Sequence, residues 1–102
     1  MAGMRTLIAR YTAQPGRGDE VAELLKEMAA AVAADEPECV LYRAARLTDT
    51  PEVFILFEEY TSQDALVAHR ETPHFKRLIE GRIAPLLDGR EREIGEPVVE
   101  AR

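Results

Sequence analysis

The sequence predicts an α+β fold of the ferredoxin-like type, in which the element order βαββαβ builds one antiparallel sheet with two helices packed on it. Three observations support this fold class. The chain has 102 residues, which is the size of one domain, and we expect that domain to span 1–102. Segments rich in β-branched and aromatic residues alternate with segments whose apolar residues recur at helical spacing. A short turn at 49–52 joins the two middle strands as a hairpin.

The first third of the chain is expected to hold a strand and a long helix. Thr6–Ala13 is rich in β-branched and aromatic residues, and the Pro-Gly turn at 14–18 ends it. A helix then begins at Asp19 or just before it, because apolar residues recur at helical spacing. These apolar residues are Val21, Leu24, Leu25, Met28 and Val32. Pro37 ends the helix at 35–36, since proline cannot continue a helix and restricts the residue before it.

The two middle strands are expected to form an antiparallel hairpin. The first is Cys39–Thr48, with Val40 and Tyr42 on one face. The second is Val53–Tyr60, whose first five residues are all apolar, which indicates burial on both faces. The helices can cover only one face of the sheet. We therefore expect a homodimer, in which a second copy of the chain covers the other face.

The second helix is expected to follow a capping segment at 61–64. Thr61 with Asp64 and Ser62 with Ala65 are both possible cap pairs. Residues 71–73 interrupt this helix, and a second helical segment runs from 74 to about 87. The pair at 88–89 is then a stop, and Arg90–Val99 is a final strand whose proline at 97 places its end at a sheet edge or past the sheet.

The charge balance excludes some classes of partner. The chain has 13 lysines and arginines against 19 acidic residues, a formal net charge of −6. Nucleic acids and anionic membranes need a basic surface, so we expect neither as a partner. The single cysteine, Cys39, cannot form an intrachain disulfide, and we see no signal peptide and no apolar stretch of about 20 residues. These features favour a cytoplasmic protein.

The segment Phe54–Tyr60, followed by Ala-Leu at 65–66, His69 and His-Phe at 74–75, resembles the signature of the antibiotic biosynthesis monooxygenase domain family. That pattern is an apolar strand ending in Glu-x-Trp/Tyr, a helix with Ala-Leu-x-x-His, and a following His-Phe or His-Leu. The resemblance extends from about Leu7 to Leu87. It implies a dimeric α/β barrel of the ferredoxin-like type. It also implies oxidation of an aromatic or quinol-type substrate by molecular oxygen, without a metal or flavin cofactor.

His69, Glu58 and Tyr60 are the candidate catalytic residues. Glu58 and Tyr60 share one face of the third strand, and His69 lies on the side of its helix that faces the sheet. A carboxylate that holds an imidazole fixes its tautomer and raises its basicity, which suits a base that removes a phenolic proton. The alternative is a structural hydrogen bond between Glu58 and His69. If the other face of the strand lines the pocket, Glu58 lies at the dimer interface instead.

We expect an apolar pocket to hold the substrate ring and exclude water. Its candidate residues are Phe54, Leu56, Leu66, His74, Phe75 and Leu78. His74 is alternatively a capping or interface histidine. On one helix it would lie about 140° from His69, which does not suit a shared metal, so we expect no metal site. Arg10 and Arg43 are either exposed strand residues or anchors for a substrate carboxylate.

The chain departs from the family pattern at two kinds of residue. Members thought to oxidise polyketide phenols use a tryptophan and an asparagine, and this chain has no tryptophan. Tyr60 stands in the place of the tryptophan. The corresponding asparagine is missing, since Leu56 stands four residues before Tyr60. Ala9 stands at the first-strand position that the haem-degrading branch uses. The alternative function is therefore a non-catalytic dimeric module that binds a small apolar molecule in the same pocket.

Overall fold

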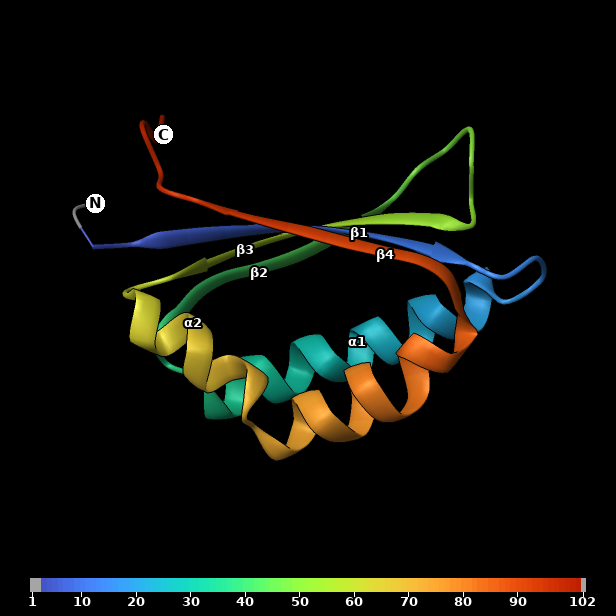
Figure 1. The fold of residues 1–102 in the computed structure, drawn as a ribbon, viewed down its shortest axis with the longest axis horizontal. Coiled ribbons are helices and arrows are strands. Elements are labelled where there is room, and N and C mark those ends of the chain that lie inside the picture. The colour runs from blue at the N-terminus through green and yellow to red at the C-terminus, as the bar shows by residue number, and fades with distance from the viewer. Residues whose placement is uncertain (1–2, 102) are drawn as a thin grey trace.

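The computed structural model describes residues 3–101 and consists of one four-stranded sheet with all helices on one of its faces (Figure 1). In chain order the elements are β1 (Arg5–Ala13), α1 (Gly18–Asp35), β2 (Cys39–Arg46), β3 (Val53–Tyr60), α2 (Gln63–Arg70), η1 (Phe75–Ile83), η2 (Ala84–Leu86) and β4 (Leu87–Gly95). The strands lie in the order β2-β3-β1-β4, and all neighbours are antiparallel. The predicted ferredoxin-like βαββαβ fold is confirmed.

The core lies between the helices and the two central strands. The predicted apolar stripe of α1 is buried there, and none of its five side chains is more than 5% exposed. Alternate residues of β1 and β3 face this stripe, among them Tyr11, Leu56 and Tyr60. Each buried side chain of this size stabilises the fold by about 1.5–3 kcal/mol. In the described residues, no helix is both long and apolar enough to cross a membrane.

Two local hydrogen-bonded turns set the directions of the helices. The Arg17 amide donates to the Gln14 carbonyl over 2.9 Å, and Gly16 between them has a φ of 83°, which glycine adopts without strain. This turn leads β1 into α1. At α2 the cap pair is Ser62 with Ala65, since the Ser62 hydroxyl accepts from the Ala65 amide at 3.0 Å.

The start of the last strand is a correction to the sequence prediction. β4 begins at Leu87 rather than Arg90, and it ends at Gly95 rather than Val99. The predicted stop at 88–89 lies inside this strand, where Gly89 pairs with Thr12 of β1. The reversal occurs earlier, in the tight 3-10 turn of η2, whose last carbonyl accepts from the Gln14 amide at 2.8 Å. A backbone contact with a residue more than 70 positions away along the chain therefore holds the start of the strand.

Two other elements differ locally from the prediction. The second helical segment, η1, winds as a π-helix with hydrogen bonds such as Ala84 N–H to the Ile79 carbonyl. In β2, Cys39 lies opposite Tyr60 while Leu41 lies opposite the residue before it, so Val40 is an extra, exposed residue in a bulge. β2 also ends at 46 rather than 48. The predicted common face of Val40 and Tyr42 is wrong, because the bulge separates them.

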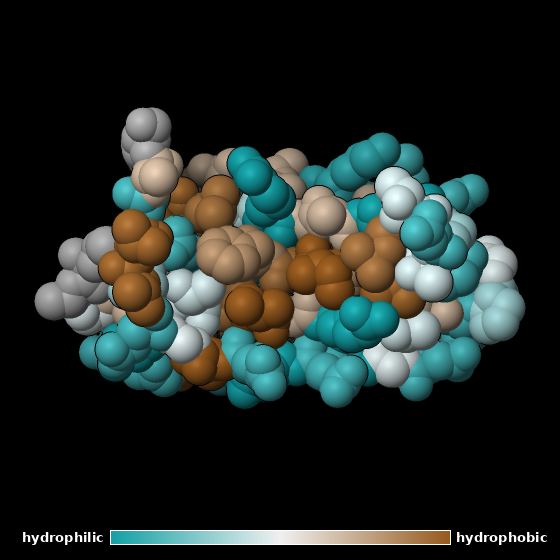
Figure 2. Space-filling model, turned by 90° about the horizontal axis from the view of Figure 1, so that it is seen from above, coloured by the Kyte–Doolittle hydropathy of each residue, from teal (hydrophilic) through white to brown (hydrophobic). Residues whose placement is uncertain are grey.

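No helix of the described part of the chain covers the second face of the sheet. Figure 2 looks onto it and shows apolar side chains in a broken band over the strands, with polar side chains between them and at the rim. Ile8 of β1 and Phe57 of β3 are exposed here, at 43% and 38% of their surface. We call this surface, defined by Ile8, Leu41, Ile55 and Phe57, the open face.

Candidate active site

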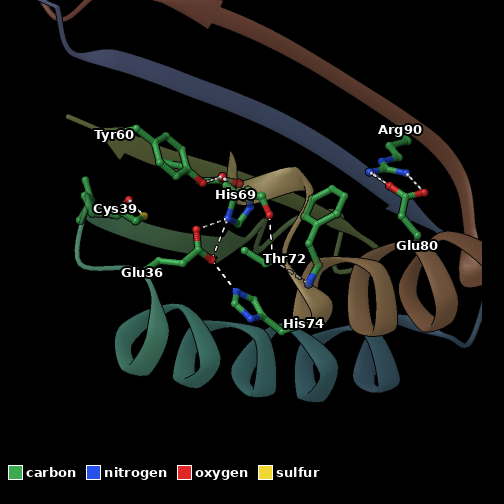
Figure 3. A network of polar contacts seen from close by, with 11 residues as sticks. Glu36, Cys39, Tyr60, His69, Thr72, His74, Glu80 and Arg90 are labelled. Carbon is green, nitrogen blue, oxygen red and sulfur yellow. Dashed lines mark hydrogen bonds and ion pairs between the residues drawn. The ribbon is translucent and has the colours of Figure 1, made fainter. Parts of the chain in front are cut away.

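A carboxylate whose side chain is 10% exposed is held by two histidines where the end of α1 meets α2 and the start of η1 (Figure 3). Glu36 is the residue after α1, and its two carboxylate oxygens lie 2.9 and 3.0 Å from His69 Nδ1. His74 Nε2 lies 2.5 Å from the same carboxylate. Because Nδ1 donates to Glu36, His69 presents its other nitrogen, Nε2, as a proton acceptor. In residues 3–101, no group of three or more His, Cys, Asp or Glu side chains could hold a metal ion.

Glu58 and Tyr60 approach the other side of the His69 ring from β3. His69 Nε2 lies 3.7 Å from Glu58 Oε1, and the Tyr60 hydroxyl donates to the same oxygen over 2.6 Å. The Tyr60 and His69 rings are 5.2 Å apart between centroids. Glu58 and Tyr60 both face the helices, as their common parity on the strand requires. The three candidate catalytic residues therefore lie together, and Glu36 joins one of them, His69, to the end of α1.

Burial changes the proton affinities of these groups. Burial raises the pKa of Glu58 to about 7, while the hydrogen bond from Tyr60 works in the opposite direction. Burial also lowers the pKa of His69, against the opposing effect of Glu36. The pKa of Tyr60 is raised by burial and by the nearby Glu58 carboxylate. Near neutral pH, the imidazole is therefore neutral and the tyrosine remains a hydrogen-bond donor, while Glu58 can give or take a proton.

A small cavity and a larger groove meet beside these residues. The cavity, of about 30 Å³, is bounded by Glu58, His69 and Tyr11 and has room for water but not for an aromatic ring. The groove has a volume of about 450 Å³, within the range of ligand sites. Three residues line both spaces: Arg70, Phe75 and Arg92. The groove and the cavity therefore adjoin each other at these three residues.

Some of the predicted pocket residues line the groove or the cavity, and the others lie in the core or beside Glu36. Four of them are core side chains no more than 2% exposed, namely Phe54, Leu56, Leu66 and Leu78. Leu66 also lines the groove, and Phe75 lines both groove and cavity. His74 bonds to Glu36 and does not border the cavity. The predicted residues that border the cavity are Glu58, His69 and Phe75.

Three polar residues of the site are missing from the sequence prediction. Glu36 precedes Pro37 and has the features of a helix end, and no periodicity connects it with histidines more than 30 residues away. The position of Arg92 could be predicted from alternation along β4 once the pairing of β4 with β1 is known. The position of Arg70 could be predicted from its place at the end of α2. Arg10 and Arg43 alternate with buried residues and lie on the open face, away from the cavity.

The raised pKa of Glu58 predicts a pH dependence of stability. A carboxyl with a pKa of about 7 when folded, against 4.5 ordinarily, binds more protons in the folded state, so its contribution to stability is lost as pH rises from 4.5 through 7. Between pH 4 and 8, we expect the unfolding free energy of the wild type to fall by about 3 kcal/mol relative to Glu58→Gln. Urea unfolding at several pH values measures this difference. A difference that is constant with pH contradicts the prediction, and Glu59→Gln controls for the loss of one charge on this strand.

This chain is similar to known proteins in both sequence and structure. The family model for antibiotic biosynthesis monooxygenase matches residues 4–81. A candidate antibiotic biosynthesis monooxygenase from Caulobacter crescentus is 31% identical, with a TM-score of 0.87 over 95% of this chain and 92% of that one. Rv0793 from Mycobacterium tuberculosis is 27% identical, with a TM-score of 0.85 over 97% and 99% of the two chains. A search of curated proteins found no match.

Proposed function

Because this chain belongs to the antibiotic biosynthesis monooxygenase family, we propose that it is a cofactor-independent monooxygenase that oxidises a phenolic or quinol-like small molecule. One observation carries the proposal. An imidazole nitrogen of His69 and the carboxyl of Glu58, whose pKa is about 7, border one cavity beside a groove of ligand size. This pair supplies a proton acceptor near neutral pH, which is what the activation of a phenol requires.

In the proposed reaction the substrate supplies all the electrons. His69 Nε2 removes the hydroxyl proton of the substrate, and the electron-rich anion reduces molecular oxygen. For a hydroquinone with a free ring position, hydroquinone and O2 give a hydroxyquinone and water. One oxygen atom enters a new C–O bond, and the other leaves as water with the two remaining hydrogens. Glu58 and Tyr60 serve as the proton relay beside the base.

In this proposal the groove and the cavity hold different parts of the substrate. The ring lies in the groove against Leu66 and Phe75, which exclude water from one side of it. Its hydroxyl group reaches into the cavity between Glu58 and His69, where it takes the place of water. Glu36 holds the imidazole so that Nε2 faces the substrate, and His74 holds Glu36 from its other side.

We also propose that the protein is a homodimer formed through the open face. This face has exposed Ile8 and Phe57 at its centre. It also carries both signs of charge, because Arg10 lies opposite Glu91 across the β1–β4 pair. In a two-fold symmetric dimer each patch meets its own copy, so apolar residues can meet at the centre and opposite charges can pair around them.

Isotope labelling tests the monooxygenase proposal directly. The protein is incubated with 1,4-dihydroxynaphthalene under ¹⁸O2, and the product is analysed by mass spectrometry. We expect hydroxynaphthoquinone with one ¹⁸O atom and the uptake of one O2 for each product molecule, while a sample without protein gives only unlabelled naphthoquinone. Binding of 1,4-dihydroxynaphthalene with no ¹⁸O in the product and no oxygen uptake above that of the protein-free sample would contradict the proposal and favour the non-catalytic binding module.

A further inference from the structure

The groove beside the cavity carries two arginines that, among the described residues, form no ion pair with a carboxylate. Of its charged residues, Lys76 pairs with Glu71 at 3.4 Å, and Glu80 pairs with Arg90 of β4 at 2.8 Å. Within the part of the chain that is described, Arg70 and Arg92 form no ion pair. The groove therefore presents two unpaired positive charges, in a protein whose formal net charge is −6.

These two arginines lie where the groove meets the cavity. Both line the groove and the cavity, and among residues 3–101 Phe75 is the one other residue that does so. Arg92 acts electrostatically on Glu58, whose pKa it lowers against the effect of burial, and Arg70 acts on His69. The remaining acidic residue at the cavity, Glu91, alternates with Arg92 and pairs across the sheet with Arg10 of the open face. Its side chain therefore points away from the groove.

We propose that Arg70 and Arg92 bind a carboxylate group of the substrate, so that the substrate class is a hydroxyaromatic acid rather than a neutral phenol. Two guanidinium groups that line one groove both attract an anion that lies between them. Their planar donors match the two oxygens of a carboxylate. The carboxylate site rests on the proposed monooxygenase function only for the reaction that follows binding.

The positions of these residues also determine how the substrate lies. With the carboxylate between Arg70 and Arg92, the ring packs against Phe75. A hydroxyl group next to the carboxylate then points into the cavity between Glu58 and His69. The carboxylate would thus select which hydroxyl group meets the base, and a neutral phenol would lack this orientation.

The test is a binding measurement that needs no turnover. The probes are 1-hydroxy-2-naphthoate and its neutral amide, 1-hydroxy-2-naphthamide, titrated into the protein by calorimetry without oxygen. We expect the acid to bind the wild type at least about tenfold more tightly than the amide, as a charge-assisted hydrogen bond provides. Arg70→Gln and Arg92→Gln should each reduce this preference, and the double variant should abolish it while it still binds the amide.

A matched control separates local contact from net charge. Arg77→Gln removes the same charge from an exposed arginine of η1 that does not line the groove or the cavity, and it should keep the preference. Equal binding of acid and amide to the wild type would overturn the proposal, as would a preference that survives in the double variant. Acid-selective binding here, together with no enzymatic ¹⁸O incorporation in the labelling experiment with 1,4-dihydroxynaphthalene, would refute the monooxygenase activity but would still support the carboxylate site.

Discussion

His69→Asn is expected to lower the rate of oxygen-dependent hydroquinone turnover by about 100- to 10,000-fold, the usual contribution of a general base. Asparagine can still donate a hydrogen bond to Glu36, but it has no nitrogen that accepts a proton near neutral pH. The substrate hydroxyl would then stay protonated in the cavity. Oxygen-electrode rates with 1,4-dihydroxynaphthalene, corrected for autoxidation, measure the effect.

His74→Asn is the matched control for this change. It also replaces a buried histidine that bonds to Glu36, but this histidine does not border the cavity. We expect it to retain most of the turnover, with any loss coming from a less rigid Glu36. If both variants lose activity equally, the cluster is needed for structure and His69 is not the base. If His69→Asn turns over as fast as the wild type, the assigned role is wrong. Circular dichroism melts show whether each variant is folded.

Phe57→Glu is expected to convert the proposed homodimer into monomers. Phe57 lies in the middle of the open face, and a two-fold interface there would bury two introduced carboxylates. A cost of about 4 kcal/mol, in line with the several kcal/mol of one such buried charge, already weakens association about 1,000-fold. Light scattering should give twice the protomer mass of 11.4 kDa for the wild type and 11.4 kDa for the variant.

Val67→Glu controls for the introduction of a charge at an exposed apolar position. Val67 is 49% exposed, similar to Phe57, but it lies on α2 at the opposite side of the molecule (Figure 1). This variant should have the same mass as the wild type. A wild type that is monomeric at micromolar concentration would contradict the dimer proposal, and so would a Phe57→Glu protein that remains dimeric.

The elements predicted accurately from the sequence are those with strong local signals. α1 has its five apolar residues at helical spacing, and β3 matches its predicted bounds, 53–60, because apolar residues and a hairpin turn define it. The start of β4 was not predictable in this way. A glycine at 89 is typical of a turn, and only the pairing with Thr12 of β1 holds it in a strand. The same is true of Val40, whose bulge depends on how β2 pairs with β3.

In the candidate site, too, some residues were predicted from the sequence and others were not. Residue types and strand parity sufficed to group Glu58, Tyr60 and His69, since their positions follow from alternation along a strand and from the face of one helix. The sequence by itself thus determined the fold, the family resemblance and these three residues. Only the tertiary structure decided that Glu36 holds His69 and that Arg70 and Arg92 meet at the cavity. The physical reason is that these contacts join side chains from separate elements, and their distances depend on how the helices pack on the sheet.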